Sequence, residues 1–226
     1  MAGSGYVRAD PARCSSRPPR SALPPPLWNH NIHYHPLVLG AVPGGCQRGL
    51  DVGCGEGALA RELRQVVPQV VAIDCDEPVI GRARQQDGGA GVEYVTGDFL
   101  TYGFPPASFD VIVSVAALHH MQPAVALRRM RQLLRPGGTL AVVGLARSRL
   151  RDLPADVAGV VGHRVLLVGK KYQEVNAPTI WPPPQTYAQI RDIAAQELPG
   201  VRYRRHLLWR YSLTWTKPPT PPAAAR

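Results

Sequence analysis

Short apolar runs alternate with amphipathic segments along most of the chain. The apolar runs predict strands over residues 49–52, 70–74, 92–98, 109–118 and 139–146. The segments between them repeat apolar residues at helical spacing and predict helices over residues 57–67, 77–86 and 123–138. Nearly continuous Val, Ile and Leu runs are typical of strands that are covered on both faces. The pattern therefore predicts an α/β fold built on a doubly wound, mostly parallel sheet.

The pattern changes after residue 146. Residues 147–185 show no regular period, and we expect an irregular connection there. A helix is predicted over residues 184–200, and two strands in an antiparallel hairpin over residues 201–218. These strands complete an expected seven-stranded sheet with an antiparallel C-terminal strand.

Composition limits the number of domains and the class of protein. The chain has 226 residues, 45% of them hydrophobic, which suits a single domain over residues 27–216. The Pro- and Arg-rich residues 1–26 and the segment 217–226 are expected to be disordered tails. No run approaches the roughly 18 apolar residues that span a bilayer, so we expect no membrane partner. The cysteines form no C-x-x-C pair, and we expect a reduced, cytoplasmic protein without a zinc or redox motif.

The formal net charge of the chain is +10. A positive charge of this size suits nucleic acid, a membrane surface or an acidic substrate. The arginines, however, are scattered between the N-terminal tail, the helix at 123–138 and the C-terminal strands, without one stripe of interleaved aromatics. We therefore do not expect a nucleic-acid partner.

A glycine-rich turn follows the first predicted strand, with glycines at Gly53, Gly55 and Gly57. Dinucleotide sites use G-x-G-x-x-G to place a pyrophosphate on a helix N-terminus. Here Asp51 precedes the turn and Glu56 lies inside it, and two carboxylates would repel a pyrophosphate. They suit a ligand that carries an ammonium and a sulfonium, such as S-adenosylmethionine, which has no phosphate.

Acidic residues also end the next two predicted strands. Asp74 is placed to accept the hydroxyls of a ribose, a role that would suit a nicotinamide dinucleotide equally well. Asp98 is placed to accept an adenine amino group, and Phe99 to pack on the ring. Taken singly, Asp51 is also placed to cap the following turn, and Asp74 and Asp76 are equally good helix-capping residues. Because the carboxyl ends of parallel strands form one crevice, we expect the three acids to line one ligand.

Five segments carry a resemblance to a known family: LDVGCGEG, AIDCDEPVI, TGDFL, FDVIVSVAALHHM and LLRPGGTLAVVG. In order and spacing they resemble the motifs of class I S-adenosylmethionine-dependent methyltransferases, most closely the small-molecule branch with the ubiquinone and menaquinone methyltransferases. The resemblance implies a Rossmann-like fold and S-adenosylmethionine as cofactor. The residues that it implies for the cofactor are Asp51 for the methionine ammonium, Gly53, Cys54, Gly55 and Gly57 for the loop, Asp74 for the ribose hydroxyls, Cys75 near the adenine, Asp98 and Phe99 for the adenine, and the backbone of Ser114, Val115 and Ala116.

Two groups of histidines are candidates for further roles. His119 and His120 follow the fourth core strand, where either imidazole is placed to take a proton from a nucleophile; the alternative is a structural turn. In a fold of this kind residues 27–45 form an N-terminal lid, and His33, Tyr34 and His35 are candidates to line the substrate cavity. The alternative is a surface helix with Trp28, Ile32 and Leu37 packed inward. We expect no metal, since no cysteine or acid lies near these histidines to complete a site.

Residues 147–185 form a candidate substrate-side insertion, with Tyr172 and Trp181 as candidate acceptor contacts; the alternative is a plain connector. The function expected from the whole pattern is methyl transfer to a small molecule by in-line displacement, in a monomer or homodimer. The alternatives are a methyltransferase acting on RNA or protein, and a non-catalytic protein that binds S-adenosylmethionine.

Overall fold

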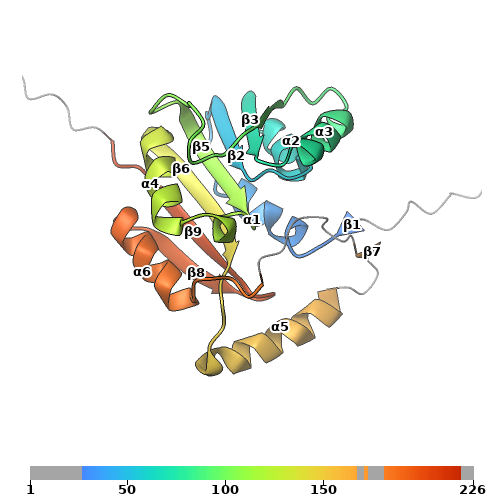
Figure 1. Cartoon of the computed structure of the whole chain (residues 1–226), viewed down its shortest axis with the longest axis vertical. Helices are drawn as coiled ribbons and strands as arrows, with labels where there is room; N and C mark the ends of the chain where they lie inside the picture. The colour runs from blue at the N-terminus through green and yellow to red at the C-terminus, as the bar shows by residue number, and fades with distance from the viewer. Residues whose placement is uncertain (1–26, 167–170, 173–180, 220–226) are drawn as a thin grey trace, which may run out of the picture.

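The computed structural model describes residues 27–166, 171–172 and 181–219. Within these residues, seven strands form one sheet in the order β4-β3-β2-β5-β6-β9-β8, and β1 pairs with β7 in a separate two-stranded sheet (Figure 1). The strands are β1 (Leu27–Trp28), β2 (Arg48–Val52), β3 (Gln69–Asp74), β4 (Glu93–Thr96), β5 (Phe109–Val115), β6 (Leu134–Leu145), β7 (Lys171–Tyr172), β8 (Arg202–His206) and β9 (Arg210–Thr216). Strands β2 to β6 pair in parallel, and β9 pairs antiparallel with both β6 and β8.

Helices cover both faces of the large sheet. The α-helices are α1 (His35–Leu39), α2 (Ala58–Arg64), α3 (Glu77–Gln86), α4 (Pro123–Leu133), α5 (Leu153–Leu166) and α6 (Tyr187–Glu197), and the short 3-10 helices are η1 (Ile32–Tyr34), η2 (Leu118–His120) and η3 (Leu150–Asp152). Figure 1 shows α4 and α6 on one face and α1, α2 and α3 on the other. The expected α/β, doubly wound fold is confirmed.

Alternation along the strands divides the hydrophobic core between the two faces. In β3, Val71 and Ile73 join the cluster under α4 and α6, whereas Val70 and Ala72 join the cluster under α1, α2 and α3. Successive strand residues point to opposite faces, so a sheet with helices on both sides needs apolar residues at every position. The continuous apolar runs in the sequence have this physical origin.

The strand order reverses between β2 and β5, which are neighbours in the sheet. From β2 the chain proceeds outward through β3 and β4, and from β5 it proceeds the other way through β6. Ligands of open α/β sheets bind outside the carboxyl ends of the strands at such a switch point. A ligand is therefore expected at the turns after β2, β3, β4 and β5.

Several predicted boundaries differ from the observed ones. The helix expected over 123–138 ends at Leu133, because β6 begins at Leu134 and runs extended through Pro136. The strand expected over 109–118 ends at Val115, where Ala116 takes a positive φ of 56°. The C-terminal tail was expected from residue 217, but the backbone of Lys217 exchanges hydrogen bonds with Gly137 and Gly138, so the ordered domain extends past Thr216.

The segment after β6 contains α5, which the sequence pattern did not predict. Its apolar residues do not face the sheet, and Gly159 and Gly162 weaken the helical signal. The pairing of β1 with β7 joins the expected N-terminal lid to the expected insertion. Among the described residues, no helix is long and apolar enough to cross a membrane.

Candidate functional site

The three glycines after β2 take left-handed backbone conformations, with φ of 70°, 53° and 76°. A Cβ on Gly53 would lie 2.2 Å from Cβ of Ala117, and one on Gly57 would lie 2.6 Å from the Tyr94 ring. A Cβ on Gly55 would meet no described atom within 4 Å. Gly53 and Gly57 are therefore required for packing, and Gly55 exposes its backbone to open space.

Asp51 is buried in β2 immediately before this loop, with 1% of its surface exposed. Its Oδ2 atom accepts no hydrogen bond from the described residues. Burial, followed by the charge of Asp74, raises the pKa of Asp51 to about 8, and a backbone contact from Ala60 offsets part of the rise. A buried carboxyl group with a spare oxygen favours a cationic partner, which would restore its ordinary pKa.

Asp74 ends β3 and ties two turns together. Its Oδ2 atom accepts a 2.9 Å hydrogen bond from the Gly55 amide, and its Oδ1 atom accepts one of 3.1 Å from the Asp76 amide. Asp76, rather than Asp74, caps α3 by accepting from the Val79 amide. Asp74 remains half-buried, and each carboxylate oxygen keeps a lone pair for a ligand.

Glu56 does not contribute free negative charge to the loop. Its carboxylate accepts 2.8 Å and 3.2 Å hydrogen bonds from Arg82 and Gln86 on α3, and the Arg82 contact lowers its pKa. Of the two carboxylates expected beside the ligand, Glu56 is therefore already neutralised by an ion pair. The carboxyl groups at this edge that keep an oxygen lone pair for a ligand are those of Asp51 and Asp74.

The turn after β4 carries Asp98 and Phe99 in different environments. Asp98 is exposed, and its Oδ1 atom accepts a 2.8 Å hydrogen bond from the Leu100 amide. Phe99 is 5% exposed and packs in the core, with the Arg129 guanidinium 5.7 Å from its ring centroid. Little of the Phe99 ring is thus available to an adenine.

The two site cysteines are free thiols, Cys54 buried in the loop and Cys75 exposed after β3. Burial raises the pKa of both thiols, and the charge of Asp74 adds to the effect. A raised pKa disfavours the reactive thiolate.

The end of β5 lies beside the glycine loop. The Ser114 hydroxyl is buried and donates a 2.8 Å hydrogen bond to the Val52 carbonyl, which joins β5 to β2. Val115 and Ala116 are half-buried, and the Ala116 amide donates to the Val143 carbonyl at 2.8 Å. The structure thus brings these residues to the same edge as Asp51 and Asp74.

His119 and His120 form η2 directly after that turn, with ring centroids 4.0 Å apart. His119 is 6% exposed, its Nδ1 atom has no hydrogen-bond partner among the described residues, and burial lowers its pKa to about 4. His120 is exposed; partial desolvation lowers its pKa, and the charge of Asp74 opposes that shift. Both shifts favour the neutral form of the imidazole.

The N-terminal candidates are held by structural partners. The buried Tyr34 donates its hydroxyl proton to the Leu207 carbonyl, and burial raises its pKa to about 12. His35 is buried, with Nδ1 3.0 Å from Glu62 of α2. The half-buried His33 ring contacts the Tyr34 ring edge-on, at 4.8 Å between centroids. The surface-helix alternative is wrong in part, because His35 is buried and Leu37 is exposed.

A pocket of about 440 Å³ lies next to the end of β6, and Trp181 lines it. Its other lining residues are Ala146, Arg147, Ser148, Asp156, Pro182, Pro183 and Trp209. Asp156 accepts a 2.9 Å hydrogen bond from Ser148, so its charge is partly satisfied. Half of the eight lining residues are tryptophan or proline. The side chain of Tyr172, the other candidate in the insertion, lies outside the described residues.

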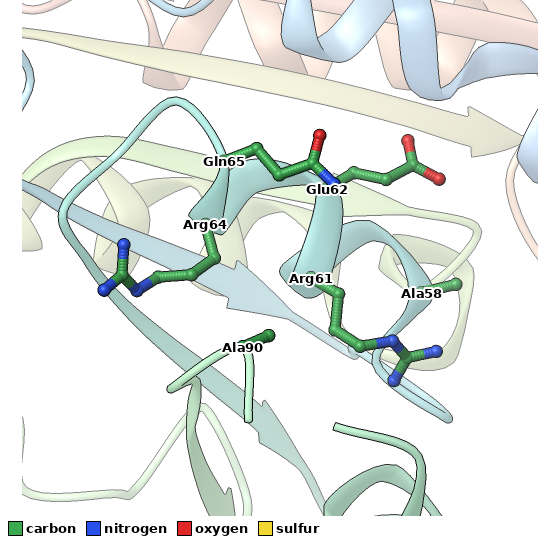
Figure 2. Close-up of a pocket in the computed structure, with 6 residues that line it drawn as sticks. All are labelled: Ala58, Arg61, Glu62, Arg64, Gln65 and Ala90. Atoms are coloured by element: carbon green, nitrogen blue, oxygen red, sulfur yellow. The ribbon is translucent and has the colours of Figure 1, made fainter. Parts of the chain in front are cut away.

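Figure 2 shows a second, open groove of about 520 Å³ on the outer side of α2. Arg61 and Arg64 extend on either side of Ala90, whereas the side chains of Glu62 and Gln65 extend from α2 on the side away from Ala90. Both arginines lie in the last turn of α2, where positive charge stabilises a helix end. No residue expected in the cofactor or acceptor sites lines this groove.

Two residues near the site were not expected from the sequence. Tyr94 packs under Gly57, and Arg210 is buried beside Asn31, to which it donates a 2.9 Å hydrogen bond. The charge of Arg210 contributes to the lowered pKa of His119. Tyr94 resembles any half-buried strand residue in sequence, and a buried arginine has no local signature. In the described part of the chain, no three His, Cys, Asp or Glu residues gather as metal ligands.

Comparisons with known proteins agree with this geometry. A family model described as a methyltransferase domain matches residues 50–142. A Mycobacterium tuberculosis protein named as an uncharacterized methyltransferase is 43% identical over 196 residues, covering 84% of this chain and 98% of the relative. A demethylmenaquinone methyltransferase from Roseiflexus castenholzii is 35% identical over 112 residues, covering 48% of this chain and 47% of that protein.

A solved structure shares the fold at lower sequence identity. The N-methyltransferase NodS from Bradyrhizobium japonicum, in complex with S-adenosyl-L-homocysteine, aligns with a TM-score of 0.58 and 18% identity. The match covers 83% of this chain and 87% of that one. At 18% identity this likeness shows the fold alone. Membership of the family is shown by the Mycobacterium tuberculosis relative, which is matched over 98% of its length.

Proposed function

The chain belongs to the class I S-adenosylmethionine-dependent methyltransferases, and from that premise we propose that it methylates a small-molecule acceptor by in-line displacement. The observation that carries the choice of acceptor is the pocket beside Ala146, at the end of β6. Because β6 pairs with β5 in parallel, the end of β6 adjoins the turn that carries the site histidines. Pockets of a few hundred Å³ with mainly apolar walls suit small molecules.

The residues at the switch point fit the cofactor of this family. We assign Asp51 to its ammonium group, because Asp51 keeps a buried oxygen without a partner. Gly55 lets the ligand approach the backbone, since no described atom lies near its missing side chain. The outer lone pairs of Asp74 suit the ribose hydroxyls, and Asp98 suits the adenine amino group. Phe99 is assigned no ring contact, because it is buried in the core.

The bound group supplies an electrophilic methyl carbon on a sulfonium, whose departure as a neutral thioether drives the transfer. The chain then has to align the acceptor with that carbon and to exclude water. We propose that His120, which is exposed near Asp74, receives the acceptor's proton at a ring nitrogen. The buried His119 holds the His120 ring from the side and is a positioning residue.

The acceptor is proposed to bind between Trp181 and Trp209. Flat aromatic walls contribute contact area with little loss of side-chain entropy, and they suit a planar or aliphatic molecule. The position of Arg147 at the same pocket adds a cation for an acidic group on the acceptor. We also propose a cytoplasmic location, because Cys54 and Cys75 are free thiols beside the site.

Incubation with methyl-labelled S-adenosylmethionine and a cell extract tests the proposed function. After separation into metabolite, RNA and protein fractions, the label is expected in the metabolite fraction. Trp181→Ala should lower that labelling while leaving cofactor affinity unchanged, because Trp181 lies outside the cofactor site. Label in RNA or protein would contradict the small-molecule acceptor. Cofactor binding without labelling of any fraction would support a non-catalytic role.

A further inference from the structure

Helix α5 packs against the domain through its polar side. Arg205 of β8 forms ion pairs with Asp152 at 2.5 Å and with Asp156 at 3.5 Å. One turn further on, Gly159 is buried near the Trp209 ring, and His163 hydrogen-bonds His30 at 2.8 Å. Positions 152, 156, 159 and 163 follow helical spacing, so they define one inward face.

The outward side of this segment is apolar. Leu150, Leu153, Val157 and Val160 are 85%, 54%, 62% and 46% exposed. Leu150 lies in η3 and the other three residues lie in α5. Their spacing of three and four residues places them in one stripe, which we call the α5 outer face. A surface helix normally buries its apolar stripe and exposes its polar one, and α5 does the reverse. Figure 1 shows α5 at the periphery of the molecule, apart from the helices that cover the sheet.

Arginine residues lie before and after the α5 outer face. Arg147 and Arg149 are exposed before its first residue, and Arg164 is exposed four residues after Val160, on the same side of the helix. Trp181, 66% exposed, shares the pocket with Asp156 of α5. Exposed apolar residues between arginines, with a tryptophan nearby, are features of helices that lie in the interface of a bilayer.

We propose that the α5 outer face is a docking surface for an anionic lipid bilayer, on which the helix lies flat without crossing it. The stripe enters the boundary of the acyl chains, and the flanking arginines contact lipid phosphates. The net charge of +10 acts in the same direction. This surface changes the expectation that the protein has no membrane partner.

A second copy of the chain fits this surface less well. Antiparallel pairing of two α5 helices would bring Arg164 of one copy beside Arg147 and Arg149 of the other. Parallel pairing would bring each cation beside its own equivalent. Like charges at these separations are repelled in either arrangement, whereas an anionic bilayer attracts all of them.

The proposal of a docking surface does not depend on the proposed methyl transfer, but the two proposals are compatible. Because Asp156 and Trp181 line the acceptor pocket, docking through α5 would bring that pocket close to the lipid phase. A lipid-dissolved acceptor would then reach the site without crossing water.

Cosedimentation of the full-length protein with vesicles tests the proposal. The wild type is expected to bind phosphatidylcholine vesicles that contain phosphatidylglycerol, and to bind pure phosphatidylcholine vesicles much more weakly. A Leu153→Ser and Val157→Ser double variant should reduce partitioning by on the order of tenfold or more. Arg164→Gln should reduce it about fivefold, and added salt should reduce it further. The matched control is Val66→Ser, because Val66 is 59% exposed on the turn after α2.

Each variant is checked by thermal unfolding, since exposed positions should tolerate serine and glutamine. Equal binding by the wild type and the double variant, equal binding to neutral and anionic vesicles, or no binding at all would overturn the proposal. Analytical ultracentrifugation that shows a dimer lost in the double variant would also overturn it, in favour of a second copy.

Discussion

The Gly55 amide donates a 2.9 Å hydrogen bond to Oδ2 of Asp74, and this contact joins the turn after β2 to the end of β3. The carboxylate that is assigned to the ribose thus also sets the position of the loop that is assigned to the methionine chain. Asp74 additionally raises the pKa of Asp51, so the two acids and the loop form one electrostatic unit. A change at Asp74 should therefore affect cofactor binding through both charge and loop geometry.

Gly57→Ala should destabilise the fold more than a glycine substitution at an open turn. A Cβ at Gly57 lies 2.6 Å from the Tyr94 ring, whereas one at Gly89 meets no described atom within 4 Å. Both glycines have positive φ, so Gly89→Ala controls for the backbone cost. We expect Gly57→Ala to lower the free energy of unfolding by a further ~1–3 kcal/mol in urea titrations. Equal losses would show that the Tyr94 contact is easily relieved.

His119 should make folding stability depend on pH between about 6.5 and 4. Burial lowers its pKa to about 4, so the unfolded chain binds this proton first as the pH falls. The free energy of unfolding should therefore decrease on acidification through that window. His119→Gln should flatten the decrease by up to roughly 3 kcal/mol, because one pKa unit corresponds to ~1.4 kcal/mol. The pKa of His30 is lowered in the same direction, but His30 is present in both the wild type and the variant and does not affect the difference between them. If His119→Gln left the pH dependence of the free energy of unfolding unchanged, a neutral, buried His119 would be contradicted.

Cofactor binding should release a proton from Asp51 below about pH 8. The pKa of Asp51 is raised to about 8 without a ligand, and a nearby ammonium would lower it. The apparent affinity should thus weaken as the pH falls below that value, by up to about tenfold per unit. Calorimetry in buffers of different ionisation enthalpy measures the proton release. The control is Asp51→Asn, with which only the ligand's own amine still titrates. If the wild type and this variant released the same number of protons on binding, the assignment of Asp51 to the ammonium group would be contradicted.

Arg205→Gln should loosen α5 from the domain. Arg205 pairs with Asp152 and Asp156, and its guanidinium lies 4.0 Å from the Tyr187 ring centroid. Hydrogen exchange over residues 152–165 should become faster, with little change in β2 to β6. The control is Arg204→Gln, at an exposed neighbour on the same strand. Equal exchange in the two variants would show that other contacts hold the helix.

Much of the fold was predictable, because its strands are apolar on both faces and its turns carry glycine or proline. The helix at 77–86 was predicted with its observed bounds, since Asp76 and Pro78 mark its start. Helix α5 was not predicted, because its apolar residues face outward and its polar residues are paired across space. Ion pairs such as Asp152–Arg205 join residues far apart in the chain and leave no local pattern.

The candidate site shows the same division. Asp51, Asp74 and the glycines meet at one edge, as the ends of parallel strands require. The side-chain partners of the other acids were not predictable: Glu56 pairs with Arg82 of α3, which lies 26 residues further along the chain. Phe99 turned into the core because Arg129 and the α4 face enclose it. The backbone topology could thus be predicted from the sequence. The directions of the Glu56 and Phe99 side chains could not, because they depend on packing.

The affinity of S-adenosylmethionine for the wild type and for Asp74→Ala tests the central assignment most directly. Calorimetry should show binding to the wild type and a loss of at least about tenfold in Asp74→Ala, because a charge-assisted contact and the Gly55 tether both disappear. Asp74→Asn, which keeps a hydrogen-bond acceptor, should lie between them. An unchanged dissociation constant in Asp74→Ala, or tighter binding of a nicotinamide dinucleotide than of S-adenosylmethionine, would contradict the cofactor site described above.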